Sequence, residues 1–182
     1  MKNNNIGISK FLSYILRHKP ESIGLSLNTE GWADINELVR LADKSGNAIT
    51  LTDITSTVKA DAKGRFSISD DGRYIRAVQG HSLKSVDLKL TEAIPPACLV
   101  HGTAQRFIDN ILKEGLVPKQ RQYVHLTENI NTAKQTGSRY GKPVVLAIDS
   151  QKMHAAGYLF YKSENNVWLT KSVPPIYITI SK

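Results

Sequence analysis

The chain has 182 residues, 41% of them hydrophobic, and its 24 Lys and Arg against 16 Asp and Glu give a net charge of +8. This is enough material for one compact domain or two small lobes with an apolar core. No apolar run approaches the roughly 20 residues that cross a bilayer, and the start MKNNN lacks the apolar stretch of a secretory signal. With a single cysteine, Cys98, we expect a cytoplasmic protein without an internal disulfide or a thiolate metal site.

The basic excess favours an anionic partner, such as nucleic acid or a phosphorylated ligand. A solubilising surface is the alternative, because charge alone defines no site. No sequence feature such as a heptad seam indicates anything other than a monomer.

The first half of the chain predicts three helices and a hairpin. Apolar residues from Ile8 to Leu16 follow the spacing of one buried helical face, and Pro20 ends this helix just after Arg17, His18 and Lys19. Asp34, with Glu37 three residues later, is typical of a capping-box variant that begins a second helix, and a third runs from about 50 to 58. FSISDDGRYIRAV reads as a β-hairpin. We therefore predict a winged-helix lobe over residues 1–88.

Residues 89–96, which include Pro95 and Pro96, read as a connector. Beyond it we predict a strand-rich lobe over residues 97–182, so that the fold class is α+β. Its expected elements are a strand near Leu99, helices at 104–114 and 131–136, a strand at 123–126, and strands at VVLAI, YLFY, VWLT and IYITI.

Several types of site are absent from the sequence: the dinucleotide fingerprint, the P-loop, the nucleophile elbow and the HExxH zinc motif. The five histidines are scattered, so we expect no metal site. What remains is a set of short segments in which basic or polar residues adjoin turns: RHKP, KGRF, IRAVQGHS, HGT, RQYVHL and GSRYGKP.

Each segment has a purely structural interpretation. Arg17 and His18 could cap the end of their helix, where cations complement the helix dipole. Arg65 could be a solvated charge at a strand edge. His101 and His125 could be hydrogen-bonded histidines of a turn or core.

Taken together with GWADI and VWLT, in this order and spacing, these segments closely resemble the RNA 2′-phosphotransferase family of NAD-dependent tRNA 2′-phosphotransferases. The resemblance runs from about Ser9 to Tyr177. It implies a winged-helix lobe that binds RNA, a second lobe of the ADP-ribosyltransferase fold that binds NAD, and an active site in the cleft between them.

The family transfers an internal 2′-phosphate of RNA to NAD, which is consumed. The 2′-phosphate expels nicotinamide to give a 2′-phospho-ADP-ribosylated RNA intermediate. The ribose 2″-hydroxyl then attacks the phosphate, releasing RNA with a free 2′-hydroxyl and ADP-ribose 1″,2″-cyclic phosphate. The substrate is classically a spliced tRNA.

The resemblance also implies roles for individual residues. The phosphate-handling catalytic set would be Arg17, His18, Arg65 and Arg121, with His18 as the proton carrier. The NAD-binding set would be His101, Gly102, Thr103, Arg106, His125, Ser138 and Arg139, with His101 donating to a ribose hydroxyl. The RNA backbone contacts would be Lys10, Lys19, Arg76 and His81. The third motif, NVWLT, lacks the catalytic glutamate of ADP-ribosyltransferases that modify proteins, which suits a phosphate nucleophile that is already an anion.

Two rival functions remain at this point. One keeps the NAD chemistry but transfers ADP-ribose to a terminal nucleic-acid phosphate or to a protein, and so leaves a lasting adduct. The other is a winged-helix regulator that binds nucleic acid without releasing nicotinamide.

Overall fold

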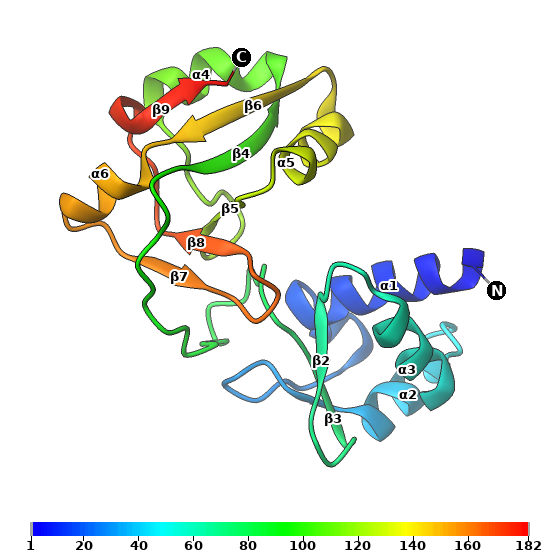
Figure 1. The fold of residues 1–182 in the computed structure, drawn as a ribbon. Helices are drawn as coiled ribbons and strands as arrows, with labels where there is room; N and C mark the ends of the chain where they lie inside the picture. The colour runs from blue at the N-terminus through cyan, green and yellow to red at the C-terminus, as the bar shows by residue number, and fades with distance from the viewer. Residues whose placement is uncertain (1, 182) are drawn as a thin grey trace. The chain divides into compact units, whose positions relative to one another are not determined.

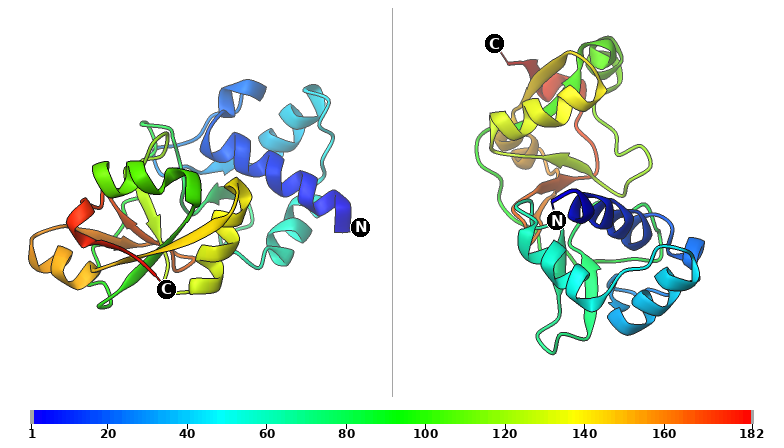
Figure 2. Two further views of the ribbon diagram at one scale, coloured as in Figure 1. Left: turned by 90° about the horizontal axis from the view of Figure 1, so that it is seen from above. Right: turned by 90° about the vertical axis from the view of Figure 1, so that its right-hand side faces the viewer.

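The computed structural model describes residues 2–181, with side chains from residue 6 onward. The chain divides into two compact units, Met1–Lys89 and Leu90–Lys182 (Figure 1, Figure 2). Both combine helices with small antiparallel sheets, which is compatible with the predicted α+β class. Within residues 2–181 no helix has the length and apolar character needed to cross a membrane.

The N-terminal unit has the helices and the hairpin expected from the sequence. Its elements are α1 (Lys2–Arg17), the 3-10 helix η1 (Pro20–Ile23), β1 (Ala33–Asp34), α2 (Ile35–Lys44), α3 (Leu51–Ala60), β2 (Phe66–Ile68) and β3 (Tyr74–Ala77). Helix α1 ends three residues before Pro20, which instead begins η1.

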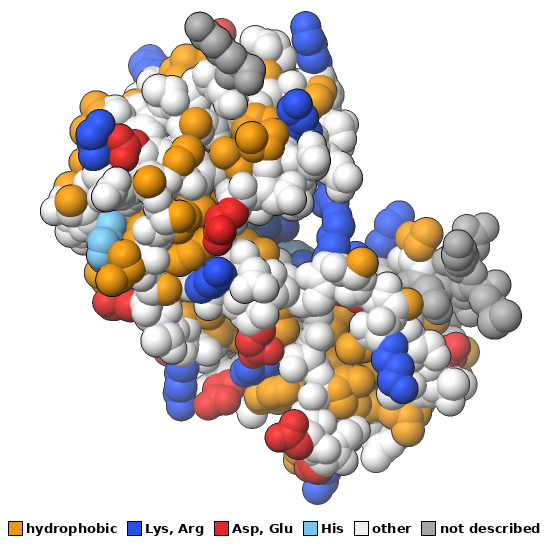
Figure 3. All heavy atoms as spheres, in the orientation of Figure 1, with side chains coloured by type: hydrophobic (Ala, Val, Ile, Leu, Met, Phe, Trp, Pro, Cys, Tyr) orange, Lys and Arg blue, Asp and Glu red, His pale blue; other side chains and the backbone are white. Residues whose placement is uncertain are grey.

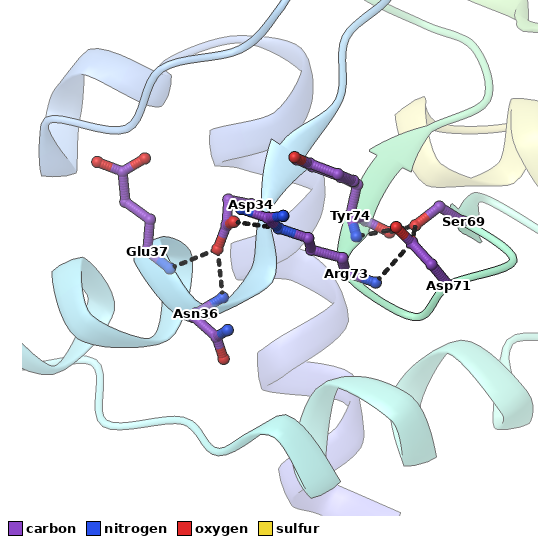
Figure 4. Close-up of polar contacts among 7 residues, drawn as sticks. All are labelled: Asp34, Asn36, Glu37, Ser69, Asp71, Arg73 and Tyr74. Atoms are coloured by element: carbon purple, nitrogen blue, oxygen red, sulfur yellow. Dashed lines mark hydrogen bonds and ion pairs between the residues drawn. The ribbon is translucent and has the colours of Figure 1, made fainter.

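The predicted hairpin is confirmed and forms a sheet in the order β1-β3-β2. Phe66 pairs with Ala77 across it. At the turn, Gly72 has a φ of +70°, and Asp71 accepts hydrogen bonds from the Ser69 hydroxyl and the Arg73 amide (Figure 4). Such short hydrogen bonds inside a turn fix the register of the two strands.

Helices α2 and α3 are each capped at the N-terminus by a side chain. The Asp34 carboxylate accepts the amides of Asn36 and Glu37 at 2.9 and 3.1 Å, which confirms the predicted cap (Figure 4). The Glu37 carboxylate pairs with Arg40 at 3.8 Å. Helix α3 has the reciprocal capping box, between Thr50 and Asp53.

The core of this unit is built on the apolar face of α1. Leu12, Ile15 and Leu16 are fully buried, as the spacing predicts. They pack in one cluster with Leu38 of α2 and Ile75 of β3. Core packing therefore fixes α1 as far as Leu16, the residue before Arg17.

The C-terminal unit contains more strands. Its elements are β4 (Leu99–Ala104), η2 (Gln105–Phe107), α4 (Ile108–Glu114), β5 (Val124–Leu126), α5 (Ile130–Gly137), η3 (Ser138–Tyr140), β6 (Pro143–Ile148), α6 (Ser150–Ala155), β7 (Phe160–Lys162), β8 (Trp168–Thr170), η4 (Pro175–Tyr177) and β9 (Ile178–Ile180). The single helix predicted over 104–114 is divided into η2 and α4. Helix α6 was missed because six residues are too few to show a helical period.

Two antiparallel sheets, in the orders β4-β6-β9 and β5-β8-β7, enclose the core of this unit. Leu99 and Leu146 from the first sheet share one apolar cluster with Leu126, Phe160 and Trp168 from the second. The bridge between Val100 and Thr127 links the two sheets.

Helix α5 packs against β4 and β6 (Figure 1), and two glycines allow this close approach. A Cβ at Gly102 would overlap the carbonyl oxygen of Ala133, and one at Gly137 would overlap that of Thr103. Tight packing alone therefore accounts for a glycine in the HGT segment.

We predict that Gly102→Ala destabilises the protein by about 3 kcal/mol or more, because backbone rather than a flexible side chain would have to move. Urea unfolding followed by fluorescence measures the change. Gly7→Ala is the matched control: Gly7 is helical with no atom within 4 Å of its added Cβ, so this change should raise stability by roughly 0.5–1 kcal/mol. Equal effects of the two substitutions would contradict this account of Gly102.

Candidate functional site

Arg17 is the last residue of α1, and only 7% of it is exposed. Its Nη2 lies 3.5 Å from the carbonyl oxygen of Arg65, which is 48 residues away in the sequence. The chain passes the guanidinium at Gly80, where φ is +89° and an added Cβ would lie 3.5 Å from Nη1. Arg17 is thus a buried cation next to Arg65, a second predicted catalytic residue.

Arg65 is held by two side chains from other parts of the N-terminal unit. The Asp61 carboxylate, whose side chain is 3% exposed, lies 2.9 Å from Arg65 Nη2 and accepts the Arg65 amide at 2.6 Å. Nη1 donates to Ser9 Oγ at 3.0 Å. Since both ends of the guanidinium are engaged, Arg65 is not the freely solvated strand-edge charge of the structural interpretation.

His18 follows Arg17 and is half-buried. Its Nδ1 lies 3.0 Å from Ser82 Oγ. Ser82 also donates its backbone amide to the carbonyl oxygen of Arg17 at 3.0 Å. Residues 17 and 18 are therefore both tied to the segment that follows β3.

His81 and Arg76 complete this basic cluster. Burial, together with the positive charges of Arg17, His18 and Arg76, lowers the pKa of His81 from 6.5 to about 4. His81 is 2% exposed, and neither ring nitrogen has a hydrogen-bond partner among the described residues. This burial favours a structural role over the predicted contact with RNA. Arg76 stacks on the ring of Trp32, with 4.4 Å between its Cζ and the ring centroid.

The two lysines predicted to contact RNA are exposed. Lys10 lies on α1, and Lys19 pairs with Glu21 at 3.3 Å between two largely exposed side chains. Such a pair adds little stability, so Lys19 can exchange its partner for a phosphate at small cost.

In the C-terminal unit, His101 lies on β4 with its Nδ1 3.0 Å from the carbonyl oxygen of His125. Burial, with a smaller contribution from the charge of Arg121, lowers the pKa of His101, and the bond to the His125 carbonyl opposes this shift. The ring is therefore neutral at pH 7, and Nδ1 must carry the proton because a carbonyl only accepts. Nε2 is then an acceptor. This tautomer offers an acceptor at Nε2, whereas the resemblance implies that His101 donates to a ribose hydroxyl.

Arg121 and His125 are neighbours, with 3.3 Å between Arg121 Nη1 and His125 Nδ1. Because a guanidinium only donates, His125 Nδ1 is the acceptor here. Burial lowers the pKa of Arg121, the charge of Arg139 lowers it further, and Tyr140 raises it. Arg139, from η3, therefore lies close enough to Arg121 for their charges to interact.

The other predicted cofactor residues are less closely grouped. Gly102 and Thr103 are buried on β4 beneath α5. Ser138 is exposed and donates its hydroxyl to the Gln135 carbonyl at 3.0 Å. Exposed Arg106 lies over the Phe107 ring, 4.8 Å from its centroid.

Two further features bear on the chemistry. The described residues contain no group of three or more His, Cys, Asp and Glu side chains that could hold a metal ion. On the face seen in Figure 3, Lys and Arg side chains lie on both units with Asp and Glu interspersed. The basic excess is thus not confined to one unit.

Residues 3–172 match the RNA 2′-phosphotransferase, Tpt1 / KptA family. This range includes every predicted site residue, from Lys10 to Arg139. The chain belongs to this family.

Curated relatives from several bacteria agree with this assignment, and each of the three described here is named "Probable RNA 2′-phosphotransferase". The chain is 52% identical to the one from Pseudomonas fluorescens, with 93% of both chains covered. It is 53% identical to that from Acaryochloris marina, again over 93% of both. For Escherichia coli the identity is 50%, covering 91% of this chain and 90% of the relative. The protein is therefore an enzyme of the RNA 2′-phosphotransferase class.

Sequence reasoning missed the residues that hold the predicted side chains in place. Asp61 and Ser9 hold Arg65, Ser82 contacts His18, and Trp32 supports Arg76. Asp61 lies four residues before Arg65, a spacing that was available as a signal. Trp32 and Ser82 lie within the GWADI and IRAVQGHS segments, but their contacts are long-range.

The buried His81 predicts a stability that depends on pH. The folded state binds fewer protons at this site than the unfolded state, so its contribution is complete above pH 6.5 and is lost as the pH falls toward about 4. The loss should reach about 3 kcal/mol. His81→Gln removes this dependence, and urea unfolding between pH 7 and 4 measures it.

His154→Gln, which changes a histidine of the other unit, should keep the wild-type loss over the same range. Parallel pH curves for wild type and His81→Gln would show that His81 is not held neutral by the fold.

Proposed function

We propose that the protein removes an internal RNA 2′-phosphate by transferring it to NAD, through a 2′-phospho-ADP-ribosylated RNA intermediate. The products are RNA with a 2′-hydroxyl, nicotinamide and ADP-ribose 1″,2″-cyclic phosphate. Family membership supports the phosphotransferase class. The NAD dependence and the two steps are our inference from the sequence segments and from the geometry described above.

The contact between Arg17 and Arg65 carries this proposal. Arg17 Nη2 lies 3.5 Å from the backbone carbonyl oxygen of Arg65, 48 residues away, and His18 is adjacent. Arg17, His18 and Arg76 also lie near enough to buried His81 to lower its pKa, and gathering cations in a partly buried place costs free energy. A dianionic phosphate offsets that cost, because guanidinium groups bind phosphate oxygens as planar forks.

In the proposed reaction Arg17 and Arg65 bind the 2′-phosphate and stabilise the negative charge on its oxygens, and the sequence segments assign the same role to Arg121. Such preorganised charge is most effective where charge accumulates in the transition state. His18 exchanges a proton with the attacking hydroxyl or with the departing RNA oxygen. Phosphate monoesters are anionic near pH 7, so the first step needs no general base.

The residues proposed for NAD fit that ligand in their hydrogen-bonding chemistry. Neutral His101 offers Nε2 as an acceptor for a ribose hydroxyl, while Arg139 is a cation suited to phosphate groups. NAD would supply the electrophilic ribose carbon. We assign the remaining cofactor contacts to the residues of the HGT and GSRYG segments and to Arg106.

The fold assignments belong to the same proposal. Three helices and a three-stranded antiparallel sheet in the N-terminal unit support a winged-helix lobe that binds RNA. The two small sheets of the C-terminal unit, with α5 packed on β4, support an ADP-ribosyltransferase-like lobe that binds NAD. Lys10, Lys19 and Arg76 are the proposed RNA contacts.

The decisive experiment incubates the protein with an RNA oligonucleotide carrying one internal 2′-phosphate, with and without NAD. We expect loss of the 2′-phosphate and release of nicotinamide only when NAD is present. Equal survival of the phosphate in both reactions refutes the proposal. An ADP-ribosylated product that accumulates without cyclic phosphate would instead assign the protein to ADP-ribosyl transfer.

Single substitutions test the assigned roles. Arg65→Ala and Arg121→Ala should lower the rate by at least 100-fold, since each removes a preorganised donor to the reacting phosphate. Arg65→Lys should restore little, because an ammonium is a point charge. His18→Ala should slow the second step more than the first, so that the adduct accumulates.

Arg40→Ala is the matched control. Arg40 lies on α2 and its exposed side chain pairs with Glu37, so the rate should remain that of wild type. Wild-type rates for the Arg65, Arg121 and His18 variants would remove their proposed roles.

A further inference from the structure

Ser82 touches both residues of the Arg17-His18 pair, although the sequence segments assign it no role. We propose that Ser82 is a positioning residue that selects the tautomer of His18 in which Nδ1 carries the proton. His18 then exchanges protons with the substrate through Nε2. This inference rests on the proposed function, because it assumes that His18 moves the proton in the second step.

The hydrogen bonds around the Ser82 hydroxyl point to this tautomer. Ser82 Oγ lies 3.4 Å from the carbonyl oxygen of Arg17 and 3.0 Å from His18 Nδ1. A hydroxyl has one proton to donate, and a carbonyl can only accept. With that proton directed to Arg17, the Ser82 oxygen accepts, and Nδ1–H of His18 is the donor. A bond at one ring nitrogen decides which nitrogen of a neutral histidine is protonated.

The end of α1 holds Ser82 in place. Carbonyl groups in the last turn of a helix lack helical partners, and the Arg17 carbonyl is satisfied by the Ser82 amide at 3.0 Å. The two preceding residues anchor the same segment: His81 is buried, and Gly80 lies against the Arg17 guanidinium. The hydroxyl is therefore presented to His18 by backbone contacts rather than by a freely rotating loop.

This arrangement defines the proton path of the second step. Neutral His18 takes the proton of the attacking 2″-hydroxyl at Nε2 and becomes the imidazolium, and the same Nε2–H then protonates the departing RNA 2′-oxygen. Nδ1 keeps its proton throughout and donates it to Ser82. One proton is taken and one is returned, so His18 ends in its starting state.

The first test observes the tautomer directly and needs no activity. Correlation of ring protons with ring nitrogens in ¹⁵N-labelled protein, above the pH at which His18 becomes neutral, identifies the protonated nitrogen. We expect the proton on Nδ1 in wild type and a shift of the proton toward Nε2 in Ser82→Ala. The His18 signals are identified by their loss in His18→Gln. A wild-type ring protonated at Nε2 overturns the inference.

The second test separates the two steps in single-turnover reactions. Ser82→Ala should slow decay of the adduct roughly tenfold, as expected for losing one hydrogen bond to a charged group. Formation of the adduct and the KM values for RNA and NAD should stay unchanged. Ser82→Thr, which keeps the hydroxyl, should recover the wild-type rate. Ser85→Ala, an exposed serine of the same segment, is the matched control.

The outcomes separate the two proposals. If wild type does not remove the 2′-phosphate, the proposed function fails, and the tautomer measurement still decides the role of Ser82. If wild type is active and Ser82→Ala slows neither step, the positioning role fails and the function stands. Equal slowing of both steps, or a lower melting temperature without rescue by Ser82→Thr, would show that Ser82 serves only the fold.

Discussion

The burial of a guanidinium at the end of α1 is the constraint on which the N-terminal unit depends. Leu12, Ile15 and Leu16 anchor the helix in the core, and Arg17 directly follows them with 7% exposure. A buried cation is tolerated only where polar groups surround it. The Arg65 carbonyl oxygen is such a group, and Gly80 packs directly against the guanidinium. The same packing that completes the unit therefore also groups residues that the sequence leaves far apart.

In the C-terminal unit the corresponding constraint is the close contact of α5 with β4. Alternate residues of β4 face opposite ways, so Gly102 meets α5 while Leu99 enters the core between the sheets. His101 projects from the Leu99 face and reaches the His125 carbonyl on β5. A strand fixed on one face by a helix and on the other by apolar packing can hold a histidine in one orientation, which a binding or catalytic group requires.

Three histidines of the two units show how the surroundings of a residue type determine its role. His81 is neutral because it is buried beside arginines, and His101 is neutral because burial outweighs its backbone bond. His18 is half-buried and bonded to a hydroxyl. Of these three, only His18 is bonded to a side-chain hydroxyl, which can either donate or accept. In our proposal it is accordingly the proton carrier, while His101 accepts a hydrogen bond and His81 supports the cluster.

The sequence by itself determined the elements and the chemistry-bearing segments of this protein. Local spacing and turn chemistry are encoded in neighbouring residues, so the α1 face, the Asp34 cap and the hairpin turn could be predicted. The order of the RHKP, KGRF, HGT and RQYVHL segments indicated the family that the comparisons establish. Only the tertiary structure decided that Asp61 and Ser9 contact the Arg65 guanidinium, that His81 is buried, and that Ser82 contacts His18. Except for the Asp61 pair, these contacts join residues far apart in the chain, and burial and protonation depend on everything packed around a group.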